Sequence, residues 1–448
     1  PMLTIYHPAP PKTWANDGKG EIRMTGKYGG AAKVIASTGN CSLSDTPLDF
    51  EFALLITPAK AVNPAKHFSE KYYHTWHTND ETLAQAIKDG ANIINLHHAN
   101  DLNPVINYPF ILQQEPLKNF IREQHQSNRK VKLYYTIREI TTYVAEIQAL
   151  RSLGHEIFFP GPGKGLSWCQ EHLIEDYEPA WFTELPNQGH DAAIVLSGFS
   201  RWINYYLEGL RWMFENYEIA GIYLDDVSFD REVLKRIRKI MAEYRPGALI
   251  DLHSNTGFSI GAANQYTDFF PYVDRLWFGE SFQYNRMMPD EWFVTCSGIP
   301  FGQMSDMLQS GGNRFLGMVY GSTARHSWEC EPPPSPFPVW QVWNLFGIEQ
   351  AQMIGYWDKT CPVKTDHPNV KATAYVREGK TLISIGNFDE KDQQIHLSFD
   401  WEKLGIDPAK AILEAPFVDN FQEEKTFKTD EIIPVKSKEG WLLILKNK

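Results

Sequence analysis

Two adjacent carboxylates, Asp225 and Asp226, directly follow a run of strand-forming residues at 221–224 and precede a helical pattern. In (β/α)₈ barrels the chemistry takes place at the carboxyl ends of the strands, where side chains converge and the following loops enclose a site. Successive strand residues point to opposite faces, so Asp225 shares the face of Tyr223. The pattern predicts that Asp225 points into a barrel and does chemistry there, whereas Asp226 faces away and anchors a loop or contacts a substrate.

A second acid, Glu280, closes the strand-like run 275–280. Cleavage of a glycosidic bond uses two carboxyl groups, about 5 to 5.5 Å apart for retention of configuration or about 6.5 to 9.5 Å apart for inversion. Carboxylates on the fourth and sixth strands of a barrel face each other across its mouth at such separations. The apolar residues before Glu280 favour a raised pKa and a general acid role. We therefore predict that Asp225 and Glu280 are the catalytic pair.

Structural roles remain open for the same acids. Asp225 or Asp226 can cap the following helix or pair with Arg231, and Glu280 can be a buried salt-bridge partner. The repetition of acids and histidines at equivalent strand ends favours a functional site over these alternatives.

The residues expected to bind substrate lie within or just after strand-like runs, mostly near their ends, or in the rim loops. They are Asp226, Asp251, His253, His97, His98, Arg138, Trp277, Arg325, Trp357 and Asp358. Histidine, arginine and acids would bind hydroxyl groups, while the tryptophans would offer flat faces to sugar rings. For the histidines, a place in the core is an equal alternative.

Other kinds of site are not indicated. The histidines, His326 included, form no His-x-x-x-His or His-Glu-x-x-His motif, so we predict neither a metal nor another cofactor. The glycine-rich run 160–165 lacks the Gly-Lys-Ser/Thr ending of a phosphate loop and is expected to cover the barrel mouth. Residues 197–200 do not supply the Gly-x-Ser-x-Gly turn of a serine hydrolase.

Composition narrows the class of protein. The chain has 448 residues, a net charge of −12 and a pI near 5.6, which disfavour nucleic acid and anionic lipid as partners. It contains 14 Trp, 20 Tyr and 26 Phe, a load that suits carbohydrate recognition as well as core packing. No apolar run is long enough for a membrane span. The five cysteines include no C-x-x-C pair, so they predict neither a zinc site nor a disulfide framework.

The order of the strand-like and helical segments that carry these residues indicates an α/β fold in three parts. Residues 1–65 are expected to be a β-rich segment, part of a β-sandwich. Residues 66–362 are expected to form a TIM-like (β/α)₈ barrel, and residues 363–448 an antiparallel, all-β domain. Predicted helices span 81–90, 202–216 and 231–244. Predicted barrel strands span 93–98, 131–138, 221–224, 248–253, 275–280, 315–320 and 353–357.

Several motifs resemble a family of bacterial glycoside-hydrolase-like proteins whose catalytic domain is described as a domain of unknown function. The likeness covers roughly residues 50–448 and rests on 221–225, 251–254, 277–280, 297–302 and 355–358. The resemblance implies a β-sandwich, then a barrel, then a small β-domain, and it implies hydrolysis of sugars without fixing the substrate.

The placement of the acids is also similar to that in melibiase-type α-galactosidases and barrel α-N-acetylgalactosaminidases. This likeness implies that Asp225 is the nucleophile and Glu280 the acid/base of an exo-acting, retaining glycosidase for α-galactosyl-type residues of complex glycans. The junction at 56–60 is similar to that of β-N-acetylgalactosaminidases that use an adjacent Asp-Glu pair in substrate-assisted cleavage. Here the pair is Asp225-Asp226, with the shorter acid in second place.

Two further expectations concern the setting of the protein. A non-catalytic carbohydrate-binding protein on a barrel scaffold is the alternative from a different class. The chain begins with Pro1, which indicates a fragment, so the lack of a signal peptide in it says little about location. We expect the protein in the periplasm, at the cell surface or outside the cell.

Overall fold

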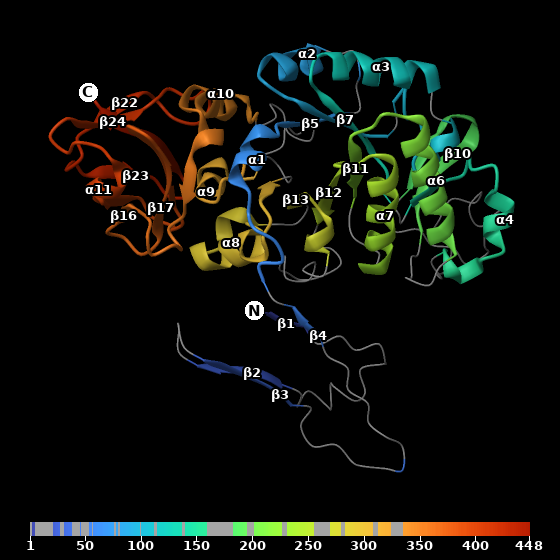
Figure 1. The fold of residues 1–448 in the computed structure, drawn as a ribbon, viewed down its shortest axis with the longest axis horizontal. Coiled ribbons are helices and arrows are strands. Elements are labelled where there is room, and N and C mark those ends of the chain that lie inside the picture. Colours follow the sequence, from blue (N-terminus) through green and yellow to red (C-terminus); the bar gives the residue numbers. More distant parts are fainter. Residues whose placement is uncertain are drawn as a thin grey trace. The chain divides into compact units, whose positions relative to one another are not determined.

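The structure is a computed structural model, shown as a ribbon in Figure 1. It describes residues 2–4, 21–26, 31–37, 45, 53–55, 57–75, 78, 81–98, 100–111, 114–136, 139–158, 182–194, 201–225, 231–254, 269–278, 283–307, 312–323 and 335–448. None of the helices in these ranges combines the length and apolarity that a membrane span requires.

The first 59 residues form a unit of their own, separate from residues 60–448. Its described strands make two antiparallel pairs. Strand β1 (Met2–Thr4) pairs with β4 (Ala53–Leu55), and β2 (Glu21–Gly26) pairs with β3 (Ala32–Ser37). Both pairs lie within residues 1–65, the segment predicted to be β-rich.

A parallel sheet of seven described strands dominates the second unit. In sheet order these strands are β5 (Tyr72–Thr75), β6 (Ile93–Leu96), β7 (Lys130–Tyr134), β11 (Gly221–Leu224), β12 (Leu249–Ser254), β13 (Arg275–Phe278) and β14 (Ser305–Met307). Strand β11 is therefore the fourth strand and β13 the sixth. At the start of β11, Gly221 has a φ of 154°, and a Cβ there would collide with the carbonyl oxygen of Leu249. Only glycine lets β11 and β12 approach this closely.

Helices cover this sheet, as the strand-loop-helix pattern predicted (Figure 1). The described helices of the barrel region are α1 (Pro64–Ser69), α2 (Glu81–Lys88), α3 (Gln114–Gln126), α4 (Ile147–Arg151), α6 (Trp202–Asn216), α7 (Arg231–Tyr244), α8 (Pro289–Thr295) and α9 (Arg314–Met318). In α7, Val233, Leu234, Ile237 and Met241 recur at helical spacing and are all buried. This spacing turns one apolar stripe toward the sheet.

Two predicted strands were wrong. Residues 314–318 form helix α9, whose N-cap Asn313 accepts a hydrogen bond from the Leu316 amide at 3.0 Å. A short apolar run does not distinguish a buried helix from a buried strand. Here the Asn313 cap favours the helix. Strand β15 (Gln352–Ile354) pairs antiparallel with β17 (Val370–Arg377) and so belongs to the C-terminal sheet.

Two barrel strands were missed because their sequences are short and polar. Strand β5 reads Tyr-Tyr-His-Thr and β14 reads Ser-Asp-Met. The buried side chain of Asp306 in β14 forms an ion pair with Arg275 of the neighbouring strand. A strand held by such a pairing carries little of the apolar signal from which strands are predicted.

A small antiparallel sheet is inserted between β7 and α6. Its order is β8 (Glu139–Thr141), β10 (Gly189–Ala193) and β9 (Phe182–Leu185). Strand β8 is buried throughout, and Asp191 of β10 lies opposite Thr141. The insert places polar side chains beside the carboxyl end of β7.

The C-terminal part contains an antiparallel sheet of six strands in the order β15-β17-β18-β24-β21-β22. The α-helices and the other strands of this part are α10 (Phe337–Phe346), β16 (Val363–Thr365), β18 (Lys380–Asn387), β19 (Gln393–Ile395), β20 (Leu397–Phe399), α11 (Trp401–Leu404), β21 (Ala411–Ala415), β22 (Lys425–Phe427), β23 (Ile433–Val435) and β24 (Gly440–Asn447). The pairs β16–β20 and β19–β23 share one apolar core with the larger sheet. Hydrogen bonds from Thr373 to the Val319 carbonyl (2.6 Å) and from Tyr375 to the Met318 carbonyl (2.8 Å) attach this sheet to the barrel.

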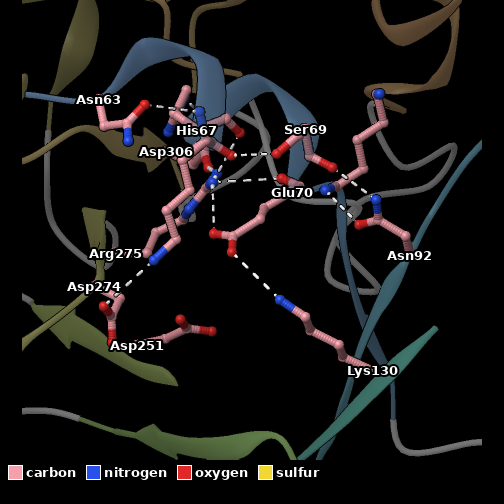
Figure 2. A network of polar contacts seen from close by, with 12 residues as sticks. Asn63, His67, Ser69, Glu70, Asn92, Lys130, Asp251, Asp274, Arg275 and Asp306 are labelled. Carbon is pink, nitrogen blue, oxygen red and sulfur yellow. Dashed lines mark hydrogen bonds and ion pairs between the residues drawn. The ribbon is translucent and has the colours of Figure 1, made fainter. Parts of the chain in front are cut away.

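A network of charges closes the amino-terminal end of the parallel sheet (Figure 2). Glu70, which follows α1, lies 3.6 Å from Lys130 and 3.9 Å from Arg275. Arg275 also donates to the carbonyl oxygen of His67 at 2.9 Å and pairs with Asp306. Barrels commonly devote this end to stability and the opposite end to chemistry. The site is therefore to be sought at the carboxyl ends of the strands.

Candidate active site

Asp225 is the first residue after β11 and lies at the centre of a polar cluster. Its Oδ1 is 2.5 Å from Nδ1 of His253 on β12, and its Oδ2 accepts a hydrogen bond from Tyr134 of β7 at 2.7 Å. The Thr136 hydroxyl donates to the Asp225 carbonyl at 2.8 Å. The Asp225 side chain keeps 28% of its surface exposed, whereas that of His253 keeps 3%. Three neighbouring strands thus hold one accessible carboxylate.

The surroundings keep Asp225 ionised. Burial alone would raise its pKa, but the charge and hydrogen bond of His253, the hydrogen bond of Tyr134 and the charge of His97 outweigh burial. The pKa of Asp225 therefore lies well below its ordinary value. Tyr134 shifts the other way, because burial and then the charges of Asp225 and Glu139 raise its pKa well above normal. The phenol accordingly retains its proton and remains a donor.

Aromatic and imidazole rings form one wall of the site. The His97 ring centroid lies 4.3 Å from those of His98 and Tyr134, and 5.1 Å from that of His74. Burial lowers the pKa of His98 to about 4 despite the opposing charge of Asp225. His98 is thus neutral at neutral pH and offers one donor and one acceptor, which suits hydroxyl groups.

The insert contributes two buried acids next to this wall. Oε2 of Glu139 on β8 lies 2.9 Å from the Tyr134 hydroxyl oxygen. Oδ2 of Asp191 on β10 accepts from the Ile106 amide at 3.2 Å and lies 3.9 Å from Nε2 of His98. Burial raises the pKa of Asp191 to about 7, although hydrogen bonds from Thr141 and Ile106 oppose the shift.

Asp191 predicts a pH dependence of stability. The folded chain holds the Asp191 proton up to a pH of about 7, whereas an ordinary Asp releases it near 3.8. The folded state therefore binds more protons in this window, and the free energy of unfolding falls as the pH rises through it. Between pH 5 and pH 8 the wild type should lose about 2 to 3 kcal/mol relative to Asp191→Asn, which cannot ionise.

Urea unfolding at several pH values measures this difference. Asp392→Asn is the matched control, because Asp392 is exposed and accepts a backbone hydrogen bond from Ser437 that asparagine can keep. The control should follow the wild type across the range. Parallel curves for the wild type and Asp191→Asn would contradict the prediction.

Two residues expected to bind substrate lie deeper in the barrel. Asp251 is fully buried and pairs with Lys132 of β7, and Asn95 lies 3.4 Å from the same carboxylate. Trp277 is 2% exposed and packs edge-to-face on Tyr72 at 5.4 Å. Both belong to the barrel interior rather than to its mouth. Asp251 lies in the middle of β12, whereas the prediction placed it at the end of its strand.

Trp357 and Asp358 are not brought to Asp225. They follow β15, which carries the chain into the C-terminal sheet, and Trp357 stacks on Phe293 at 4.7 Å. Both line a cavity of about 550 Å³ together with residues of the C-terminal part, such as Lys364. The predicted rim position rested on a barrel strand at 353–357 that does not exist.

The other predicted site residues are Glu280, Asp226, Arg138 and Arg325, which lie outside the described residues. His97, His98 and His253 do gather around Asp225. Within the described ranges, no three His, Cys, Asp or Glu side chains form a group that would hold a metal ion.

Sequence reasoning missed Tyr134, Glu139 and Asp191. Tyr134 could have been found from the sequence. Along the predicted strand 131–138 every second residue points into the barrel, as Asp225 does at the end of its own strand, and Tyr134 belongs to that inner face. Glu139 and Asp191 come from the insert, whose strands are short and whose acids match no motif.

Comparison with known proteins supports the assignment of the fold. The profile of the glycoside hydrolase 123 TIM-barrel domain matches residues 63–327, the C-terminal domain of that family matches residues 335–446, and its third domain matches residues 1–58. No curated protein sequence matches the chain.

Solved structures with a similar fold include two amylases. A noncanonic maltogenic α-amylase from Thermotoga neapolitana has 11% identity and a TM-score of 0.55, with 85% of this chain and 99% of the amylase covered. The α-amylase of Geobacillus thermoleovorans, solved with acarbose, has 11% identity and a TM-score of 0.51 over the same shares, 85% and 99%. At this identity the likeness concerns the fold alone. The three matched domains show that the chain belongs to glycoside hydrolase family 123 and is a glycosidase.

Proposed function

We propose that this glycosidase is exo-acting and retaining, that it removes galactose-configured residues from complex glycans, and that Asp225 is its ionised carboxylate. The observation that carries the proposal is the pair of contacts on Asp225, at 2.5 Å from His253 and 2.7 Å from Tyr134. These contacts fix a negative charge at the barrel mouth, where the transition state of glycoside cleavage develops positive charge on the sugar. The galactose configuration rests on the likeness of the acid positions to those of melibiase-type enzymes.

In the first candidate mechanism, Asp225 attacks the anomeric carbon of an α-galactosyl residue. Glu280 first protonates the leaving oxygen and then activates water for the second step. Glu280 stands two residues beyond the end of β13, the sixth strand, and Asp225 directly follows the fourth. His97 and His253, with Arg138, would orient the hydroxyl groups.

The second candidate is substrate-assisted cleavage of an N-acetylhexosaminide, and the contacts of Asp225 favour it. Oδ2 already accepts a hydrogen bond from Tyr134, Oδ1 lies 2.5 Å from His253, and the lowered pKa makes Asp225 a weak base. A carboxylate that is held in place and is weakly basic is better suited to orienting an acetamido group and stabilising the oxazolinium ion than to attacking the anomeric carbon. Asp226 would then protonate the leaving oxygen.

A panel of 4-nitrophenyl glycosides tests the substrate class. We expect turnover of an α-galactoside or of an N-acetylgalactosaminide, and little turnover of glucosides and fucosides. The panel should contain both anomers of each sugar, and 4-nitrophenol release is the measurement. Turnover confined to a sugar of another configuration would overturn the galactose assignment while leaving Asp225 to be tested separately.

Variants and inhibitors then separate the two mechanisms. Loss of activity in Glu280→Gln, with covalent labelling of Asp225 by a 2-deoxy-2-fluoro glycosyl fluoride, would support the first. Inhibition by a thiazoline analogue of the oxazolinium ion, with loss of activity in Asp226→Asn but not in Glu280→Gln, would support the second.

A further inference from the structure

The cavity of about 550 Å³ beside the C-terminal sheet is separate from the cluster around Asp225. The described residues that line it all lie between Tyr356 and Ala372, whereas Asp225 and its contacts belong to β7, β11 and β12. Its volume falls within the range of about 300 to 1,000 Å³ that is typical of small-molecule sites. The cavity is therefore large enough to bind a ligand of its own.

Two half-buried aromatic side chains, Tyr356 and Trp357, supply apolar surface to the cavity. Trp357 stacks on Phe293 with a centroid distance of 4.7 Å, and the Tyr356 hydroxyl donates to the Pro289 carbonyl at 3.0 Å. A Cβ on Gly355 would lie 2.3 Å from the Trp357 ring, so only glycine leaves that ring in its place. The two rings thus form a fixed surface of the kind that packs against the C–H groups of a sugar.

Three lysines, Lys359, Lys364 and Lys371, line the same cavity. Nζ of Lys371 lies 4.9 Å from the centroid of the Tyr356 ring. The positive charge therefore stands next to the aromatic surface. In a chain with a net charge of −12, this grouping of lysines gives the cavity a local charge that differs from that of the protein as a whole.

The two acids of the cavity wall, Asp358 and Asp366, are engaged by neighbouring residues. Oδ1 of Asp358 accepts hydrogen bonds from the amide (2.8 Å) and the hydroxyl (2.7 Å) of Thr360. Oδ1 of Asp366 accepts from the His396 amide at 3.0 Å, and its Oδ2 lies 3.1 Å from Nδ1 of His396. These acids hold the turns of the wall in place, while the lysines face a ligand with an excess of positive charge.

His367 adds a neutral donor to the wall. Its Nδ1 accepts a hydrogen bond from the Asn369 amide at 3.2 Å, so the ring proton resides on Nε2. The turn that carries His367 is held by a hydrogen bond from the Thr365 hydroxyl to the Val370 carbonyl. Lysine and this form of histidine donate hydrogen bonds, and carboxylate and sulfate groups accept them.

We propose that this cavity is a second carbohydrate-binding site, which binds an acidic sugar residue of a glycan. The lysines and Nε2 of His367 bind the carboxylate or sulfate group, and the sugar ring packs against Tyr356 and Trp357. The site does no chemistry and holds the acidic part of the glycan on the enzyme. The inference goes beyond the proposed function, because it rests on this cavity in a glycosidase and not on the role of Asp225.

Isothermal titration calorimetry at low salt tests the class of ligand. The probes are trigalacturonate, a sulfated galactotriose and neutral galactotriose. At least one acidic probe should bind at least about tenfold more tightly than the neutral one, and salt should weaken its binding. Binding of trigalacturonate alone would identify the acidic group as a carboxylate, and binding of the sulfated probe alone would identify it as a sulfate. No preference for either acidic probe, or equally strong binding of inorganic sulfate, would overturn the proposal.

Lysine variants assign the binding to this cavity. Lys364→Met combined with Lys371→Met should weaken binding of the acidic probe by about tenfold or more. The matched control is Lys425→Met combined with Lys428→Met, because Lys425 also lies over an aromatic ring, at 4.5 Å, and Lys428 is exposed as Lys364 is. The control should bind like the wild type. Equal affinities of the two double variants would contradict the proposal, and thermal unfolding checks that both remain folded.

Protection from chemical modification locates the ligand independently. The acidic probe should slow the acetylation of Lys364 and Lys371 but not that of Lys425 and Lys428, as measured by mass spectrometry. Binding without this protection would place the ligand elsewhere and overturn the proposal. None of these measurements requires turnover, so failure of the proposed function and failure of this inference are distinguishable.

Discussion

Asp225→Asn is expected to lower kcat/KM by at least about 10³-fold. The substitution keeps the shape of the side chain but removes its charge, which both candidate mechanisms require. It also places an amide N–H₂ group opposite either the His253 ring or the Tyr134 hydroxyl, both of which contact an acceptor in the wild type. The measurement is 4-nitrophenol release from whichever glycoside the wild type turns over.

The chain offers a matched control in a second Asp–His pair. Asp366 and His396 are 3.1 Å apart in the C-terminal part, and their side chains are 53% and 56% exposed. Asp366→Asn should leave kcat/KM unchanged within about twofold, because an exposed pair contributes little. Comparable losses in both variants, or retained activity in folded Asp225→Asn, would remove Asp225 from the mechanism.

Lys132→Met is expected to lower the free energy of unfolding by about 3 to 5 kcal/mol. Lys132 and Asp251 are both fully buried and form an ion pair inside the barrel. Burial lowers the pKa of Lys132 and raises that of Asp251, while each partner opposes the shift of the other. Removal of the lysine leaves a buried carboxyl group without its main partner. Urea or thermal unfolding at neutral pH measures the loss.

Two further variants show that the pairing causes the loss. Lys130→Met changes the same residue type two positions earlier on β7, where the side chain is 49% exposed and 3.6 Å from Glu70, so it should cost less than about 1 kcal/mol. Lys132→Met combined with Asp251→Leu should cost clearly less than the sum of the single changes. Additive losses would mean that the two side chains do not depend on each other.

Local periodicity predicted the part of the fold that is built from long, apolar elements. The alternation along 221–225 predicted that Tyr223 and Asp225 share a face, and the structure places both next to Tyr134. The stripe in residues 231–244 predicted α7, and the loss of helical pattern near the end of the chain predicted the C-terminal β-structure.

Contacts between distant residues account for what the sequence did not reveal. Asp306 can lie in a buried strand because Arg275 neutralises it, and Glu139 reaches Tyr134 only because an inserted sheet folds beside β7. Neither pairing leaves a local pattern. The same limit explains why Asp251 was expected at the mouth: nothing near it in sequence indicates that Lys132 binds it inside the barrel.

The insert β8-β10-β9 has a consequence for how such a site changes over evolution. Both of its connections leave the parallel sheet between β7 and α6, so its sequence can diverge without displacing any barrel strand. Yet it carries Glu139 and Asp191, which adjoin Tyr134 and His98 beside Asp225, the carboxylate that we propose to be catalytic. Exchange of residues 139–193 between homologous enzymes would therefore replace the side chains on one side of the proposed site together. Asp225 would still come from the barrel that receives the insert.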